Sequence, residues 1–395
     1  MAELLDVVVV GGGIMGSCSA YHMAKAGLKP TVLEQFSEGH SRGSSHGQSR
    51  IIRYAHGDAT YLPIMKESYE LWEELERASG KTLLKKCGLL WVSSSEASVR
   101  SCSRILEKFG IEHHLLRGEQ IQEEFPQFRY GDKWFGLVDP EGGVVYADRC
   151  LKAAHKEAIE HGAEFRFGEK VTKIESRGDR VVVVAGEAIY EARNVVVTVG
   201  GWLNEVLPGI KDVVDVQAEQ IGVMYWKVAR NAELYGPTGN CPTVAVEEAG
   251  KIMYMLPPVD YSNQIKFCYH AGEPIDPNRP LAEMPAYAHQ IPLEHISNHL
   301  PDIDASKPST IDRCLYTMTK DSHYAIGRYP SDARIVVAGG FSGSGFKLAI
   351  TVGRIVKDLV KGVEESHTVP ELFRITRKRV EQRCMVGGVP EGATL

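Results

Sequence analysis

A glycine-rich turn between two apolar segments near the N-terminus constrains the fold of this 395-residue chain more than any other feature. Residues 5–36, LDVVVVGGGIMGSCSAYHMAKAGLKPTVLEQF, have the pattern of a buried strand, a turn, a helix and a second strand. Gly11, Gly13 and Gly16 match the G-x-G-x-x-G spacing, in which glycine permits a tight turn, the approach of a pyrophosphate and close helix packing. The pattern predicts a Rossmann-type βαβ unit whose helix N-terminus binds the phosphates of a dinucleotide.

The second strand of this unit ends at an acidic residue, Glu34. A carboxylate at this position can accept hydrogen bonds from both hydroxyls of an adenosine ribose. Glu34 is therefore predicted to bind the ribose, which favours FAD or NAD over NADP. Because FAD and NAD proteins share the glycine pattern, residues 11–34 leave both cofactors open.

Length and composition indicate an ordinary globular protein of about two domains, because one core rarely keeps growing over 395 residues. The chain has 45 basic and 51 acidic residues, and this net charge of −6 gives no electrostatic reason to expect nucleic acid as a partner. No apolar run approaches the roughly 20 residues of a membrane-spanning helix. We therefore expect a small-molecule ligand and neither nucleic acid nor membrane as a partner.

The cysteines give no sign of a metal site or of a disulfide framework. All eight lie far apart, without a C-x-x-C pair or Cys/His ligand spacing, so no metal is expected. The N-terminus leads directly into the first strand without a secretory signal, which predicts reduced thiols and an intracellular location.

Four further segments resemble one family of flavoproteins. They are HSRGSSHGQSRIIR at 40–53, KFCYH at 266–270, CLYTMT at 314–319 and GFSGSGFK at 340–347. In this order and spacing they resemble the monomeric sarcosine oxidase and L-pipecolate oxidase family, and the similarity runs nearly end to end. The resemblance implies an α/β fold with a Rossmann-type FAD-binding domain, interleaved with an α+β substrate domain on a mixed or antiparallel sheet.

In that family a cysteine binds FAD covalently, through a thioether to the flavin 8α-methyl carbon. Cys314 matches the attachment position, so the resemblance implies that it is the tether. We expect neighbouring Arg313 to favour the thiolate that forms the bond by lowering the thiol pKa. The alternative is a buried structural thiol, which is also the interpretation for the other seven cysteines.

The resemblance also implies a substrate that is a secondary amino acid. Arg53 and Lys347 match the pair that binds the substrate carboxylate, one by a bidentate contact and one as a point charge. Their alternatives are a surface ion pair for Arg53 and a solvated side chain for Lys347. Tyr254 and Tyr316 match tyrosines around the substrate.

Four residues match positions with a catalytic role in the family. Lys266 matches the lysine that promotes the reaction of reduced flavin with oxygen, and its alternative is an edge-strand lysine facing water. His270, on the same strand face as Lys266, matches a histidine of the substrate pocket. Arg50 and His46 match basic residues that lie against the flavin ring.

The glycine-rich segment 340–347 is predicted to contact the cofactor through Gly343, Gly345 and Lys347, as is Ser44 in the earlier segment. A helix follows this turn, and its N-terminus would point at the flavin pyrimidine ring. The chain has Ser344 and Ser45 where family members often have histidine. These two departures leave the preferred substrate and the flavin potential open.

The predicted FAD-binding domain comprises residues 1–85, 146–215 and 311–385, and the substrate domain comprises 86–145 and 216–310. Residues 386–395 are expected to form a C-terminal tail. The segment 61–80 is predicted to be a helix whose apolar stripe belongs to the core. The members of this stripe are Leu62, Met65, Tyr69, Trp72 and Leu75.

The resulting hypothesis is a monomeric FAD-dependent oxidase of secondary amino acids such as sarcosine, L-pipecolate, L-proline or another N-methyl amino acid. The substrate is oxidised to an imine, which hydrolyses to aldehyde plus amine, and O₂ is reduced to H₂O₂. The alternatives are a flavin-dependent dehydrogenase with another acceptor, a non-catalytic flavin-binding protein, and an NAD-dependent dehydrogenase, which would leave Cys314 without a role.

The C-terminal tripeptide is a second sequence signal on location. Animal relatives are often peroxisomal, but the terminal ATL lacks the basic middle residue of S-K-L-type signals. We expect a cytoplasmic location, with the peroxisome as the alternative.

Overall fold

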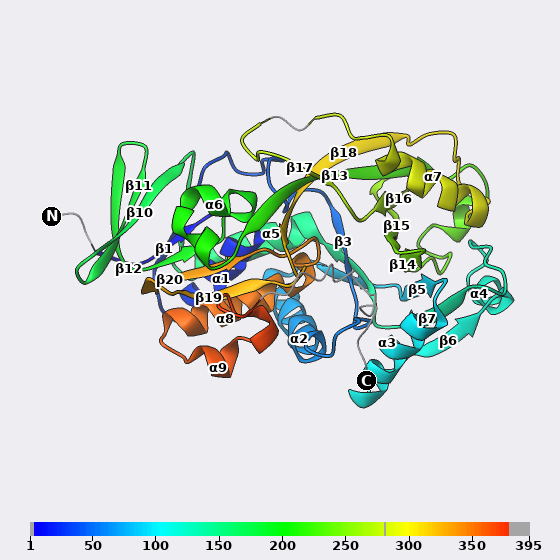
Figure 1. The fold of residues 1–395 in the computed structure, drawn as a ribbon, viewed down its shortest axis with the longest axis horizontal. Coiled ribbons are helices and arrows are strands. Elements are labelled where there is room, and N and C mark those ends of the chain that lie inside the picture. The colour runs from blue at the N-terminus through cyan, green and yellow to red at the C-terminus, as the bar shows by residue number, and fades with distance from the viewer. Residues whose placement is uncertain (1–3, 280–281, 379–395) are drawn as a thin grey trace.

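The computed structural model of the protein describes residues 4–279 and 282–378. Two large sheets dominate it, an eight-stranded sheet and a nine-stranded sheet, and the long strands β13 and β18 run between the two sides of the molecule (Figure 1). Both sheets mix parallel and antiparallel pairs, which confirms the predicted α/β fold class. The predicted C-terminal tail, residues 386–395, lies outside the described residues.

The eight-stranded sheet contains the predicted βαβ unit. Strands β1 and β2 pair in parallel, with Val7 opposite Pro30, and helix α1 connects them. The valines of β1 are fully buried because helices or loops cover both faces of the sheet, as is typical of parallel strands. The strand order is β10-β11-β12-β1-β2-β9, β20 pairs with β12, and β19 pairs with β20. The strands span β1 Leu4–Val10, β2 Pro30–Glu34, β9 Glu164–Phe167, β10 Val171–Arg177, β11 Arg180–Ala185, β12 Ala188–Val197, β19 Ala325–Tyr329 and β20 Asp332–Gly339.

Helices α1, α2, α5 and α8 share one hydrophobic core with β1, β2, β12 and β20. The predicted stripe of α2 is confirmed, because Leu62, Met65, Tyr69, Trp72 and Leu75 are all buried. Helix α8 follows a short 3₁₀ turn at Phe346–Leu348. These helices span α1 Ile14–Lys25, α2 Tyr61–Ser79, α5 Ala147–Glu160 and α8 Ala349–Val360.

The nine-stranded sheet has the order β17-β13-β16-β15-β14-β5-β7-β6, and β18 pairs with β13. Helix α7 packs on this sheet, where Ile296 contributes to a core with Phe267 and Met255. The strands span β5 Leu89–Ser93, β6 His114–Arg117, β7 Phe135–Asp139, β13 Val216–Lys227, β14 Thr243–Glu248, β15 Lys251–Tyr261, β16 Gln264–Tyr269, β17 Glu273–Pro274 and β18 Thr310–Thr319; α7 spans Tyr287–His299.

A small sheet of order β3-β8-β4 joins the two sides. Its strands span β3 Ser49–Ile52, β4 Leu84–Lys86 and β8 Gly143–Tyr146. The shorter helices span α3 Glu96–Lys108, α4 Glu119–Glu124, α6 Leu203–Val206 and α9 Glu365–Thr368. Strand β18 belongs to the nine-stranded sheet, whereas the sequence-based division assigned residues 311–385 to the FAD-binding domain; the domain boundaries stay a prediction.

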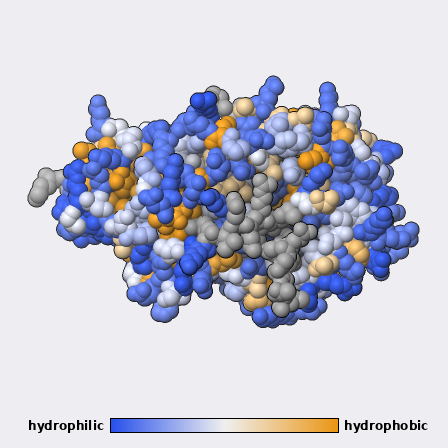
Figure 2. All heavy atoms as spheres, in the orientation of Figure 1, coloured by the Kyte–Doolittle hydropathy of each residue, from blue (hydrophilic) through white to orange (hydrophobic). Residues whose placement is uncertain are grey.

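The surface is mainly hydrophilic on the face drawn in Figure 2, with small hydrophobic groups scattered over it. Among the described residues, no helix is both long and apolar enough to cross a membrane.

Helices α1 and α8 pack closely because α8 has a glycine at their contact. A Cβ atom on Gly353 would lie 2.5 Å from the backbone carbon and oxygen of Cys18. Backbone atoms within a packed helix cannot move aside as a flexible side chain can. Glycine at 353 therefore determines how near the two helices lie.

We expect Gly353→Ala to destabilise the protein by about 1–3 kcal/mol, because the cost of overpacking exceeds the gain of about 0.5–1 kcal/mol in helix propensity. Urea unfolding of the purified protein measures this difference. Gly131→Ala is the control, since the added Cβ has no atom within 4 Å, and its expected change is within about 0.5 kcal/mol. Equal stability of the two variants would contradict the packing argument.

Candidate active site

A single large cavity receives residues from both sheets and from the segments singled out in the sequence. Its empty space is about 1960 Å³, open solvent at the mouth included. Its lining extends from the glycine turn to Arg53 and Lys347, so one cavity connects the predicted dinucleotide and substrate sites. It is lined by the predicted site residues Gly11, Gly13, Glu34, Ser44, Arg50, Arg53, Tyr254, Lys266, His270, Cys314, Tyr316, Gly343, Gly345 and Lys347.

The glycine turn has the geometry of a dinucleotide cradle. Gly11 has φ +99°, and a Cβ there would lie 2.7 Å from the backbone oxygen of Thr198. The space for a Cβ on Gly16 is filled by the carbonyl oxygen of Gly11, so Gly16 serves packing and does not line the cavity. Glu34 accepts hydrogen bonds from the backbone N–H of Gly12 (2.9 Å) and of Phe36 (3.0 Å), which hold its carboxylate at the cavity wall.

The first part of the segment 40–53 lies beside the glycine turn. The hydroxyl of Ser45 accepts a hydrogen bond from the N–H of Ile14 (3.0 Å), at the first turn of α1. The Arg50 guanidinium donates to the carbonyls of Ser44 (2.9 Å) and His46 (2.7 Å), so the loop is fixed around this cation. His46 is not among the residues that line the cavity; its ring contacts the carbonyls of Gly43 and Arg313 instead.

Cys314 lies in the middle of β18, opposite Ile221 of β13, and is 5% exposed. Burial raises the pKa of its thiol, and the cations that oppose this effect are Arg50 and Lys266. The expectation of a lowered thiol pKa is wrong, and Arg313 is not among the residues that act most on the thiol. The side chains of neighbouring residues in a strand point to opposite faces. The seven cysteines within the described residues are all free thiols, and Cys384 lies outside them.

Two buried cations lie at the other end of the cavity. Arg53 and Lys347 are each 4% exposed, so the surface ion pair and the solvated lysine considered as alternatives are wrong. Burial lowers the pKa of both side chains, and the charge of Arg53 lowers that of Lys347 further. Lys347 Nζ donates to the Ser344 carbonyl (2.8 Å), whereas the buried Nη1 of Arg53 has no hydrogen-bond partner within the described residues.

An acid that the sequence analysis missed lies near Arg53. The charge of Asp139 opposes the lowering of the Arg53 pKa, and its Oδ2 accepts hydrogen bonds from the N–H groups of Tyr54 (2.6 Å) and Ala55 (3.0 Å). Burial raises the pKa of Asp139 itself. This carboxylate anchors the chain after Arg53 and only partly balances two buried positive charges.

An aromatic group borders the space in front of the cations. Tyr316 and His270 are joined through the phenol oxygen and Nδ1 (3.2 Å), and the ring of Tyr254 lies edge-on to His270 at 6.2 Å. A Cβ on Gly343 would lie 2.5–2.6 Å from the rings of Tyr316 and His270. Burial lowers the pKa of His270 to about 4, with Arg53 and Lys347 adding to the effect, so the imidazole is neutral at pH 7.

Lys266 is buried and paired with a residue that sequence reasoning missed. Its Nζ lies 3.0 Å from Oδ2 of Asp260 and donates to the hydroxyl (2.7 Å) and carbonyl (3.2 Å) of Ser49. The interpretation as a water-facing edge lysine is therefore wrong. Lys266 holds the pKa of Asp260 below its usual value. The only sequence signal for this pair is the short β15–β16 hairpin, in which Tyr261 pairs with Gln264.

Comparison with known proteins gives the family. Residues 6–359 match the family model described as FAD dependent oxidoreductase. The chain is 36% identical over 380 residues to a mouse protein named peroxisomal sarcosine oxidase, covering 95% of this chain and 96% of that one. It is 28% identical over 392 residues to a monomeric sarcosine oxidase of Bacillus sp. (strain NS-129), covering 98% of this chain and 100% of that one.

Two solved structures have the same fold as this chain. The open form of NikD, an unusual amino acid oxidase essential for nikkomycin biosynthesis, superposes with a TM-score of 0.81 at 22% identity, over 97% of this chain and 100% of that one. The L-proline dehydrogenase of P. horikoshii superposes with a TM-score of 0.80 at 23% identity, over 95% and 98% of the two chains. The chain therefore belongs to the family of FAD-dependent oxidoreductases, together with the sarcosine oxidases to which it is similar.

Proposed function

We propose that this protein is an FAD-dependent oxidase of secondary amino acids, such as sarcosine, L-pipecolate, L-proline or another N-methyl amino acid. The observation that carries the proposal is the pair of buried cations, Arg53 and Lys347, in the cavity that also contains the glycine turn and Cys314. The sarcosine oxidases among the relatives support the same reaction. Bound FAD would supply the acceptor for the two electrons of the C–H bond next to the substrate nitrogen.

The residues of the glycine turn fit the dinucleotide. Gly11 and Gly13 leave room for the pyrophosphate beside the N-terminus of α1, and Glu34 would accept from the ribose hydroxyls. Cys314 would hold the flavin by a thioether at its 8α position. Arg50 and Lys266 lie near enough to act on the Cys314 thiol electrostatically, and both favour the thiolate that this bond requires.

Arg53 and Lys347 would bind the substrate carboxylate. A buried guanidinium without a partner for Nη1 is costly unless a ligand completes its hydrogen bonds. Asp139 supplies one negative charge against these two positive charges, so an anion in the cavity improves the balance. An amino acid meets the requirement, and a simple amine does not.

The same cations determine the protonation state of the substrate amine. A positive potential disfavours a further positive charge nearby. Arg53 and Lys347 act in this direction on His270, whose pKa is lowered mainly by burial and further by these two charges. The amine would therefore bind in its neutral form, which has the lone pair that imine formation requires. Neutral His270, held by Tyr316, would border the reacting carbon.

Lys266 would favour the reaction with oxygen by stabilising negative charge that develops beside it. The ion pair with Asp260 reduces this effect and is the observation that favours the alternative, a dehydrogenase with a different acceptor. Release of H₂O₂ under air identifies the oxidase. Reduction of a dye without H₂O₂ identifies the dehydrogenase.

Three further features of the hypothesis belong to this proposal. We infer that residues 86–145 and 216–310 form the substrate domain and that the remaining described segments bind FAD. We further propose a monomer. We propose a cytoplasmic location, with the peroxisome as the alternative that the name of the mouse relative suggests.

Cys314→Ser is expected to release the flavin. After acid precipitation the yellow colour should stay with the wild-type pellet and pass to the supernatant of the variant, as read from visible absorption spectra. Cys87→Ser, a thiol that does not line the cavity, should behave as wild type. Free flavin in the wild-type supernatant would refute the tether and leave FAD dependence intact.

Lys347→Met is expected to raise KM for the amino acid by about 10- to 100-fold, because one charge-assisted hydrogen bond to the carboxylate is lost. Steady-state kinetics with sarcosine measure the change. A secondary amine without a carboxylate should show no such difference, and Lys361→Met, beyond the far end of α8, is the control variant. An unchanged KM for sarcosine would contradict the carboxylate assignment.

The double variant Lys266→Met/Asp260→Asn is expected to react with oxygen about 100-fold more slowly, since it removes a preorganised cation without leaving an unpaired buried charge. Stopped-flow mixing of the substrate-reduced enzyme with O₂ measures the rate. Lys227→Met, at the exposed end of β13, is the control. If the double variant reoxidises at the wild-type rate, Lys266 has no part in the oxygen reaction.

A further inference from the structure

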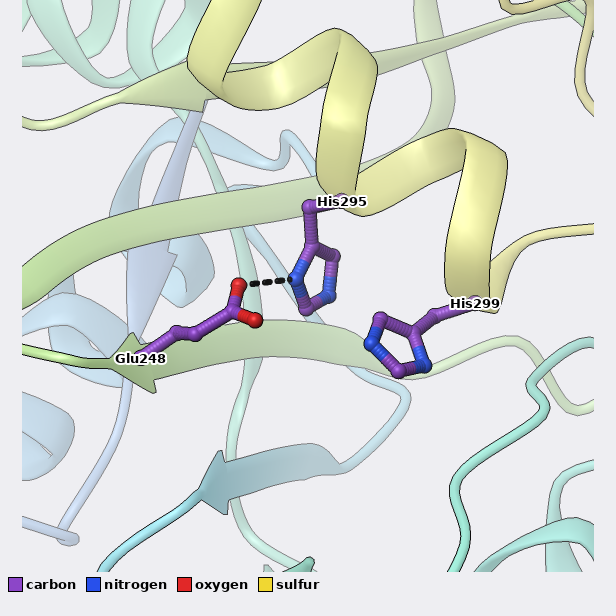
Figure 3. Close-up of side chains that lie close together, drawn as sticks. All are labelled: Glu248, His295 and His299. Carbon is purple, nitrogen blue, oxygen red and sulfur yellow. Dashed lines mark hydrogen bonds and ion pairs between the residues drawn. The ribbon is translucent and has the colours of Figure 1, made fainter.

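Two histidines and a glutamate meet on the nine-stranded sheet, apart from the cavity described above. His295 and His299 project from the last turns of α7, four residues apart and hence on one face of the helix, and Glu248 ends β14 (Figure 3). One ligand atom from each side chain lies within 4.8 Å of the others. None of the three residues lines the cavity.

The hydrogen bond of His299 determines which of its nitrogens is free. Its Nδ1 lies 2.7 Å from the backbone oxygen of Arg129. A carbonyl only accepts, so Nδ1 carries the proton and the neutral ring has its lone pair on Nε2. A backbone carbonyl on the opposite nitrogen is the usual arrangement of a metal-binding histidine. Figure 3 shows the other ring nitrogen of His299 facing Glu248 and His295.

His295 has an outer partner of the same kind. Its Nδ1 lies 2.9 Å from Oε2 of Glu248, and its Nε2 lies 2.9 Å from the Tyr130 hydroxyl. A phenol can donate to Nε2 or accept from it, so either tautomer of the ring is satisfied on that side. A carboxylate oxygen only accepts, so Nδ1 of His295 carries the proton in its hydrogen bond to Glu248. Neutral imidazole and carboxylate are the forms in which these side chains ligate metals.

Aromatic side chains hold both imidazoles in place. Phe267 stacks on His295 at 5.5 Å, and Tyr130 stacks on His299 at 4.6 Å. Trp134 lies edge-on to both rings, at 5.7 and 4.9 Å. Ring orientation is thus fixed before any ligand binds, whereas the partly exposed Glu248 leaves a side open to water.

We propose that Glu248, His295 and His299 bind a divalent first-row transition ion such as Zn²⁺, with water as the fourth ligand. Two imidazoles and one carboxylate are a donor set of open zinc sites. Zinc–ligand bonds of about 2.0–2.2 Å in tetrahedral geometry hold the ligand atoms about 3.4 Å from one another. The ligand atoms here lie within 4.8 Å of one another, so small side-chain movements bring them to that distance. The proton on His295 Nδ1 moves to Nε2 and remains there, where the N–H donates a hydrogen bond to the Tyr130 hydroxyl, and the ring stays neutral.

The bound ion ties α7 to the end of β14. It replaces the single hydrogen bond between His295 and Glu248 by three metal–ligand bonds. An ion that binds only the folded form stabilises it in proportion to its affinity and concentration. The competing interpretation is that the hydrogen bond is the whole function of the cluster.

The test is a titration of the EDTA-treated, desalted holoenzyme with zinc sulfate by calorimetry, together with elemental analysis after gel filtration. We expect one strongly bound Zn²⁺ per chain and a rise in the thermal unfolding midpoint. Loss of an outer partner alone weakens metal sites about 10–100-fold, so removing a ligand in Glu248→Gln or His299→Gln should weaken binding at least about 10-fold. Tyr130→Phe should weaken it within that range.

His289→Gln is the matched control, because it removes a histidine of the same helix that is not part of the cluster. It should keep both the bound Zn²⁺ and the thermal shift. Unfolding midpoints without metal identify any variant that fails to fold, and Glu248→Gln, at a partly exposed position, is the substitution least disturbing to the core. No Zn²⁺ on the wild type, or equal binding by all variants, would overturn the proposal.

Discussion

The close contact of helix α1 with the backbone around it determines where most of the candidate site lies. Gly16 lets α1 approach the carbonyl of Gly11, and Gly353 lets α8 approach the backbone of α1 at Cys18. Helix α8 begins directly after the 3₁₀ turn that contains Lys347. The cation at one end of the cavity is therefore positioned by the same packing that shapes the dinucleotide turn at the other. The ammonium group of Lys347 contributes little to this positioning, since its hydrogen bond goes to the carbonyl of Ser344, three residues earlier in the chain.

Local patterns were sufficient for much of the fold. The βαβ unit and the apolar stripe of α2 followed from spacing alone, because both depend on neighbours along the chain. Asp260 and Asp139 escaped notice because their importance arises from burial beside Lys266 and Arg53, which no local pattern encodes. The histidine pair of α7 is visible in the sequence at four-residue spacing, but its third member comes from β14. The lowered pKa expected for Cys314 was wrong for a related reason, since burial, which raises it, is not encoded by its neighbours in the sequence.

The nine-stranded sheet separates two chemical environments. Lys266 of β16 and His270, directly after the end of this strand, line the cavity, whereas Phe267 of β16 stacks on His295 behind the sheet. Alternation along one strand thus assigns consecutive residues to the candidate active site and to the histidine cluster. The two regions share strands without sharing side chains, since β14 likewise supplies Ala245 to the cavity and Glu248 to the cluster. Changes in one region therefore act on the other through the positions of β14 and β16.

The order of strands in the eight-stranded sheet also has a consequence for biosynthesis. Strand β1 pairs on one side with β2, which follows it closely in the chain, and on the other side with the later strand β12. Strand β20, which pairs with β12, is synthesised only after all strands of the nine-stranded sheet. At about 5–20 residues per second, translation separates β1 from β20 by tens of seconds. During this time the valines of β1, fully buried in the finished protein, lack part of their cover. The cavity, whose lining runs from Val10 to Lys347, is likewise complete only after nearly all of the described chain has been synthesised.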